Sequence, residues 1–231
     1  MTTFFTYGDI KTKVERDLDL EGETFITDEE MLGYANEAVD EVERQIHALY
    51  DDYFLTRSTI ALVAGTEEYA LPSDIYAMKI RAVVYRNGSQ VWQVPRIRDW
   101  KKFLQYEMDQ ATGTTSPGSY GFFVLNQTAG SPKIVFAPTP QETGSFLKIW
   151  YIRNANTLTT TASTFDIPES INYVMQYMKV RCYEKEMNPN IQKAMVDLER
   201  EKTDTLAVLA NMFPDNENDI EMDTRLYDDM T

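Results

Sequence analysis

Residues 27–50 read TDEEMLGYANEAVDEVERQIHALY, and this stretch contains the clearest helical pattern in the chain. Thr27 and Glu30 have the spacing of a capping box, in which the hydroxyl accepts from an amide three residues on and the carboxylate reaches back. Apolar residues then recur at steps of three and four, the period of an amphipathic helix. They are Met31, Tyr34, Ala35, Ala38, Val39, Val42, Ile46 and Leu49. The stretch therefore predicts a long helix that ends near Tyr50.

Helical patterns also occupy both ends of the chain. Residues 7–18 place Ile10, Val14 and Leu18 at helical spacing. Pro168 is suited to the first turn of a helix that continues to Asn188-Pro189, and another helix runs from Ile191 to about Phe213. The helix after Pro168 carries two apolar stripes. The first comprises Ile171, Val174, Met175, Met178 and Cys182, and the second Tyr173, Tyr177 and Val180.

The middle of the chain has the composition of β-structure. Asn87-Gly88 is a strong hairpin signal, because both residues tolerate the positive φ of a type I′ turn. A short helix is expected over 98–108. The expected strands are 57–64, 78–85, 90–94, 122–125, 133–137 and 146–153.

These patterns predict an α+β protein. Its N- and C-terminal helices, residues 1–53 and 167–213, would form a discontinuous helical bundle. Residues 54–166 would be an inserted antiparallel β-domain, either a sandwich or a small barrel. Residues 214–231 would be an acidic tail that is flexible or docks on a partner.

The net charge of −15 is unevenly distributed. Residues 1–50 carry −9 and residues 213–231 carry −6, whereas 51–166 carry +1 and 167–212 carry −1. An acidic protein gains nothing from counterion release on DNA, which argues against a protein that grips phosphates.

The cellular setting follows from what the sequence lacks. The start, MTTFFTYGD, has no signal-peptide pattern, and the longest aliphatic run, 60–64, is too short to span a bilayer. The single Cys182 forms no internal disulfide. We therefore expect a soluble protein of the cytoplasm with no membrane partner.

No catalytic, cofactor or metal site is predicted. His47 is the only histidine, and Cys182 lies on an apolar stripe, which favours a buried, inert thiol. The glycines form no phosphate-binding pattern, so no cofactor is expected. The acids are abundant enough to keep one rival open, a small hydrolase that uses a carboxylate pair and a metal.

Basic and aromatic residues alternate in one short segment, Arg96, Arg98, Trp100, Lys101 and Lys102, followed by Phe103. Such a pattern can bind nucleic acid or the acidic face of a protein. The alternative is a surface helix that buries Trp100 and Phe103 while its bases stay in water. If the segment binds, a protein is the expected partner, because the chain as a whole is acidic.

Four stretches follow one another in a characteristic order. They are the capped helix 27–38; the turn 65–74, GTEEYALPSD; Pro138-Thr139-Pro140 with Gly144 before the strand 149–153, IWYIR; and 163–169, STFDIPE, which opens the helix with Tyr173, Tyr177 and Tyr183. Together, over residues 5–212, they resemble the head-to-tail adaptor (connector) family of short-tailed bacteriophages.

The resemblance implies a structural virion protein, not an enzyme, located at the head–tail junction and assembled in the bacterial cytoplasm. It would form a dodecameric ring that binds the portal, receives a tail tube or nozzle protein on its other face, and lines the channel through which DNA passes. Another tail or nozzle ring protein of the virion is the alternative within the same class.

The resemblance also suggests roles for particular residues. Leu206, Leu209, Phe213, Leu226 and Tyr227 would contact the portal, and Tyr173, Tyr177 and Val180 would contact a neighbouring subunit. A partner rim would comprise Asn87, Gly88, Arg96, Arg98, Trp100, Lys101 and Lys102.

Overall fold

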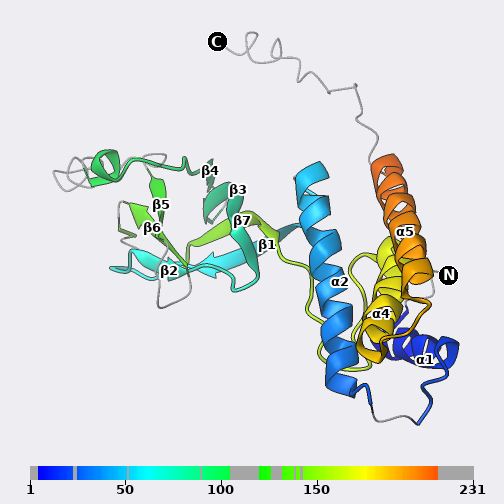
Figure 1. The fold of residues 1–231 in the computed structure, drawn as a ribbon. Helices are drawn as coiled ribbons and strands as arrows, with labels where there is room; N and C mark the ends of the chain where they lie inside the picture. Colours follow the sequence, from blue (N-terminus) through cyan, green and yellow to red (C-terminus); the bar gives the residue numbers. More distant parts are fainter. Residues whose placement is uncertain are drawn as a thin grey trace. The chain divides into compact units, whose positions relative to one another are not determined.

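The structure is a computed structural model that describes residues 5–22, 25–50, 52–88, 90–104, 120–125, 132–137, 139–140 and 143–212. The chain divides into two compact units, Met1–Leu49 with Asn156–Thr231, and Tyr50–Ala155. The first is built from helices and the second from strands (Figure 1). The predicted α+β class is confirmed.

The helical unit is arranged around one central helix, α4. Its elements are α1 (Tyr7–Asp17), α2 (Asp28–Leu49), the 3₁₀ turn η1 (Pro168–Ser170), α4 (Ile171–Glu186) and α5 (Ile191–Met212). The α4 helix contacts α1, α2 and α5 (Figure 1). Because neighbours lie on several sides, α4 buries residues around most of its circumference.

Local chemistry fixes where these helices begin and end. Thr6 and Asp9 form a capping box on α1, and Thr27 and Glu30 form the expected one at the start of α2. Pro168 opens a 3₁₀ turn, and the α-helix begins only after Ser170. Met187 ends α4 in the left-handed conformation, with φ 54°.

The β unit contains two antiparallel sheets. Its strands are β1 (Leu55–Ala61), β2 (Glu68–Ala70), β3 (Ile75–Asn87), β4 (Gln90–Gln93), β5 (Gly121–Leu125), β6 (Lys133–Ala137) and β7 (Phe146–Arg153). One sheet has the order β1-β7-β3-β4 and the other β2-β6-β5. The first and last strands, β1 and β7, pair directly, which brings the two ends of the inserted unit together.

Both sheets contribute to one aromatic core. Tyr85 of β3 stacks on Phe136 of β6 with ring centroids 5.9 Å apart, and Tyr120 stacks on the same ring at 4.7 Å. Ile149 of β7 and Ile134 of β6 are fully buried in this cluster. Of the two arrangements expected, the described strands therefore form a sandwich, and they do not close into a barrel.

Two local predictions for the β unit differ from the structure. Asn87 pairs with Gln90, so the hairpin loop starts at Gly88, which has a φ of 56°; Asn87 is in the last strand pair and lacks a positive φ. Residues 65–74, read as a turn, contain the short strand β2. Tyr69 fixes this strand by donating its hydroxyl to the Thr66 carbonyl at 2.8 Å.

The second boundary between the units lies at Ala155, whereas the sequence placed it at 166. Residues 156–166 belong to the helical unit, because hydrogen bonds join the backbone of this segment to α1 and α2. Asn36 on α2 donates to the Leu158 carbonyl at 3.0 Å and accepts from the Leu158 amide at 2.8 Å. The Tyr7 amide donates to the Ser163 carbonyl at 2.8 Å.

Within the described residues, no helix is both long enough and apolar enough to cross a membrane.

Candidate interaction surfaces

The basic-aromatic segment lies beside the edge of the three-stranded sheet. The Ile97 amide donates to the Phe122 carbonyl at 2.8 Å, and the chain is helical over 100–104. Phe103 is buried, but Trp100 remains 45% exposed although its ring stacks on Phe103 at 5.5 Å. Arg96, Arg98, Lys101 and Lys102 are exposed. The segment thus exposes an aromatic ring and four bases near one another in the sequence.

The predicted rim residues do not form one cluster. Gly88 precedes β4, in the hairpin loop, whereas Arg96 and the following bases come after β4. A four-residue strand is about 13 Å long, so the hairpin loop and the basic segment are at opposite ends of β4. They therefore form two separate surfaces of the β unit.

The second apolar stripe of α4 lies inside the helical unit. Tyr173 and Val180 are only 2% and 4% exposed, while Tyr177 is half-buried. Burial and a hydrogen bond to Glu41 of α2 raise the pKa of Tyr173. Lys202 of α5 donates to the same Glu41 carboxylate at 2.7 Å. Tyr173 and Val180 are therefore core residues, and only Tyr177 of this stripe offers surface to another subunit.

The predicted portal-contact residues divide in the same way. Leu209 on α5 is fully buried, whereas Leu206 is half-buried. Phe213, Leu226 and Tyr227 lie outside the described residues. Leu209 thus holds α5 in the bundle and has no surface to offer a partner. The outer side of α5 instead exposes Val196 at 70% and Val208 at 48%.

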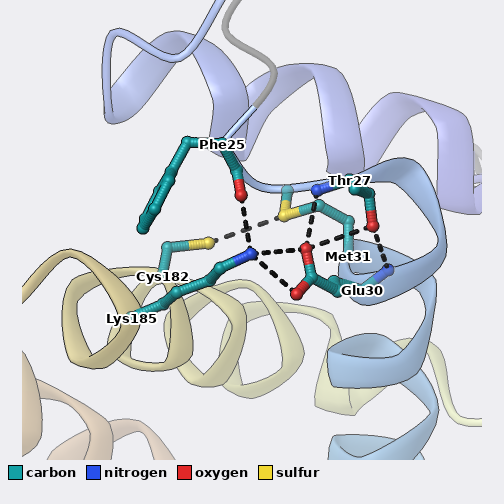
Figure 2. A network of polar contacts seen from close by, with 6 residues as sticks. All are labelled: Phe25, Thr27, Glu30, Met31, Cys182 and Lys185. Atoms are coloured by element: carbon teal, nitrogen blue, oxygen red, sulfur yellow. Dashed lines mark hydrogen bonds and ion pairs between the residues drawn. The ribbon is translucent and has the colours of Figure 1, made fainter.

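Lys185 joins the last turn of α4 to the first turn of α2 (Figure 2). Its ammonium donates to both Glu30 carboxylate oxygens at 2.7 Å and to the Phe25 carbonyl at 2.6 Å. It also lies 4.8 Å from the centre of the Phe25 ring. The hydrogen bond from Lys185, followed by that from the Thr27 amide, lowers the pKa of Glu30 to about 2. This arrangement, the Lys185 clasp, is complementary to the dipoles of both helices.

Known proteins identify the family of the chain. A family model described as SU10 adaptor protein, from a phage head-to-tail adaptor family, matches residues 5–219. The chain belongs to the SU10 adaptor protein family. No curated protein matches this adaptor. The family match spans both units and makes the adaptor a structural phage protein of the head–tail junction.

The single cysteine and the single histidine of the adaptor are both buried. Burial raises the pKa of the Cys182 thiol to about 12, and the thiol donates to the Met31 sulfur at 3.5 Å, as Figure 2 shows. The expected burial of this thiol is confirmed. His47 is buried 3.3 Å from the Glu43 carboxylate on the same helix. Among the described residues, no group of three or more His, Cys, Asp or Glu side chains is placed to hold a metal ion.

The sequence missed two contacts that order the helical unit of the adaptor. Glu30 and Lys185 are 155 residues apart, and Asn36 and Leu158 are 122 apart. The capping box predicts the position of Glu30 but assigns it only the Thr27 amide. No local pattern indicates which distant cation completes the site.

Proposed function

We propose that this adaptor forms a dodecameric ring that binds the portal, connects it to a tail tube or nozzle protein, and lines the DNA channel. The observation that carries the proposal is the family match over residues 5–219. The match includes residues of both the helical unit and the β unit, so it supports the proposal for the chain as a whole. The copy number, the portal and tail partners and the DNA channel are the parts that we propose for this phage head-to-tail adaptor.

The charge of the chain supports a channel role. A net charge of −15 gives DNA phosphates no binding well, so a duplex would slide past an acidic wall without adhering to it. A ring also needs heterologous contacts, in which two different surfaces of each subunit meet. Tyr177, half-buried on α4, is the one residue of the predicted interface stripe with surface to contribute.

We assign the portal contact to the end of the chain. Leu206 marks the start of the contact on α5, and Phe213, Leu226 and Tyr227 supply apolar anchors beyond it. Seven acids lie among those anchors in residues 213–231, and their charge would set the register on the portal. The hairpin at Gly88 and the exposed Trp100 segment would contact the tail-side protein as two separate surfaces.

Deletion of residues 214–231 tests the portal assignment. The truncated chain should retain the melting temperature and circular dichroism of the full chain but lose binding to the portal from the same phage in a pull-down. The double variant Leu226→Ala with Tyr227→Ala tests the apolar anchors, and it should weaken portal binding although the charge of the chain is unchanged. Replacing the seven acids with Asn or Gln tests the charges, and it should weaken portal binding although the apolar residues are unchanged. Full portal binding by the truncated chain would refute the assignment.

A further inference from the structure

The four-stranded sheet of the β unit has two different faces. On β7, Leu147, Ile149 and Tyr151 point into the sandwich core. Because side chains alternate along a strand, Phe146, Lys148 and Trp150 project from the opposite side. That side is the outer face of the sheet, and its strands are labelled β1, β7, β3 and β4 in Figure 1.

The strand register places basic and apolar side chains next to one another on this outer face. Arg57 of β1 is opposite Trp150, and Arg86 of β3 is opposite both Phe146 of β7 and Val91 of β4. Lys148 lies between these rows on β7. We call this set, Arg57, Arg86, Lys148, Phe146, Trp150 and Val91, the outer basic face.

The cations of the outer basic face have no carboxylate partner in the described structure. All four strands of the sheet lack Asp and Glu altogether, although they contain six bases. Two other bases of the β unit are paired with carboxylates, Arg81 with Asp52 and Lys133 with Glu68. Arg86 and Lys148 instead lie 5.8 Å and 5.9 Å from the centre of the Phe146 ring. Three cations thus share one surface, and no carboxylate of the described residues pairs with them.

The apolar content of this face favours a protein partner over DNA. Val91 is 57% exposed, and Phe146 and Trp150 are half-buried. Aromatic residues and arginine are enriched in the cores of protein interfaces. A DNA-binding surface on a flat sheet would instead need many cations along a phosphate track, and here there are three.

We propose that the outer basic face binds the acidic helical unit of a second copy of this chain. The helical unit, 1–49 with 156–231, carries 28 acids and 11 bases, a net charge of −17, whereas the β unit carries +2. The contact joins two different surfaces and can therefore repeat around a ring. It rests on the proposed function, because it names a surface through which the proposed ring closes.

Zero-length carbodiimide coupling, which joins an amine to a touching carboxylate, tests the proposal. An equal mixture of ¹⁴N- and ¹⁵N-labelled full-length chain is treated alone and in the presence of the portal, then digested and analysed by mass spectrometry. We expect mixed-isotope peptides in which Lys148 is joined to an acid of the helical unit. Absence of such peptides in both samples, or exclusive coupling within one copy, would overturn the proposal.

Matched variants distinguish a specific contact at the outer basic face from a general effect of the charge of the β unit. Arg57→Glu with Arg86→Glu and Lys148→Glu should weaken self-association by tenfold or more in sedimentation experiments at low salt. Arg96→Glu with Arg98→Glu and Lys102→Glu makes the same charge change elsewhere on the β unit and should leave self-association unchanged. Lys148→Arg should abolish the cross-link yet keep the association. Equal weakening by both triple variants would contradict the proposal.

Two further readouts separate this proposal from its alternatives. A duplex DNA probe followed by fluorescence anisotropy should bind wild type and triple variant equally weakly; loss of DNA binding in the outer-face variant alone would assign the face to DNA and overturn the proposal. Portal binding is scored in the same samples. Mixed cross-links without portal binding would refute only the proposed portal role, and portal binding without them would refute only this contact.

Discussion

The two units of the adaptor differ in net charge, in the composition of their cores and in their tryptophan content. The helical unit carries a net charge of −17, and polar contacts between helices far apart in the sequence, such as the Lys185 clasp, supplement its apolar core. The β unit carries +2 and has an aromatic core between two sheets. A subunit built this way presents an acidic surface and a near-neutral, partly basic one, which suits contacts with different partners.

The difference also makes the units separately observable. All three tryptophans, Trp92, Trp100 and Trp150, belong to the β unit, so tryptophan fluorescence reports only on the sandwich. The long α-helices belong to the other unit and dominate circular dichroism at 222 nm. Phe136→Ala and Tyr173→Phe, described next, each change one unit, and the two signals show which unit responds.

The largest effect is expected from Phe136→Ala. The Phe136 ring is fully buried and stacks on Tyr85 and Tyr120, so its loss removes apolar burial and leaves a cavity. The free energy of unfolding of the sandwich should fall by about 3–5 kcal/mol. The fluorescence transition should shift to lower urea, while the helical transition moves less. Equal shifts of both signals would show that the units unfold as one.

A smaller effect is expected in the helical unit from Tyr173→Phe. This change removes the buried hydroxyl that bonds to Glu41 and leaves the ring in place. The helical transition should lose about 1–2 kcal/mol, with the fluorescence transition unmoved. Tyr177→Phe is the matched control, because its hydroxyl donates at 3.1 Å to Glu37 at the surface. If the control costs as much as Tyr173→Phe, burial does not explain the effect.

The smallest effect is pH-dependent and comes from Glu30→Gln. Because the folded-state pKa of Glu30 is lowered to about 2 from an ordinary 4.5, its stabilisation is complete above pH 4.5 and is lost as the pH falls towards 2. The variant should melt below wild type at neutral pH, and this gap should close between pH 4.5 and 2. Glu29→Gln, in the same first turn but outside the ion pair, should lower the melting temperature less than Glu30→Gln does. A gap that stays constant in acid would contradict the role of the clasp.

Sequence patterns were sufficient where local chemistry decides the structure. The capping box at Thr27 and the helical spacing after it predicted α2, and Asn87-Gly88 predicted the β3–β4 hairpin. The loop was misplaced by one residue because strand pairing, which the dipeptide does not specify, determines the last paired position. Local patterns therefore predicted elements better than their exact registers.

The surfaces were harder to predict because they depend on which elements meet. Two apolar stripes on α4 suggested a neighbouring subunit, but Lys202 and Glu41 show that α5 and α2 of the same chain enclose Tyr173. Conversely, Arg57, Arg86 and Lys148 are scattered in the sequence, and only strand register places them on one face. Helix periodicity reveals an apolar side but does not identify the partner that covers it.

An adaptor with the proposed function assembles as a ring on the portal. Native mass spectrometry with negative-stain imaging of the full-length chain, alone and mixed with the portal from the same phage, tests it most directly. We expect rings of adaptor on the portal in the mixture, with fewer or smaller oligomers in the chain alone. An adaptor that remains monomeric and does not associate with the portal would contradict the proposed function.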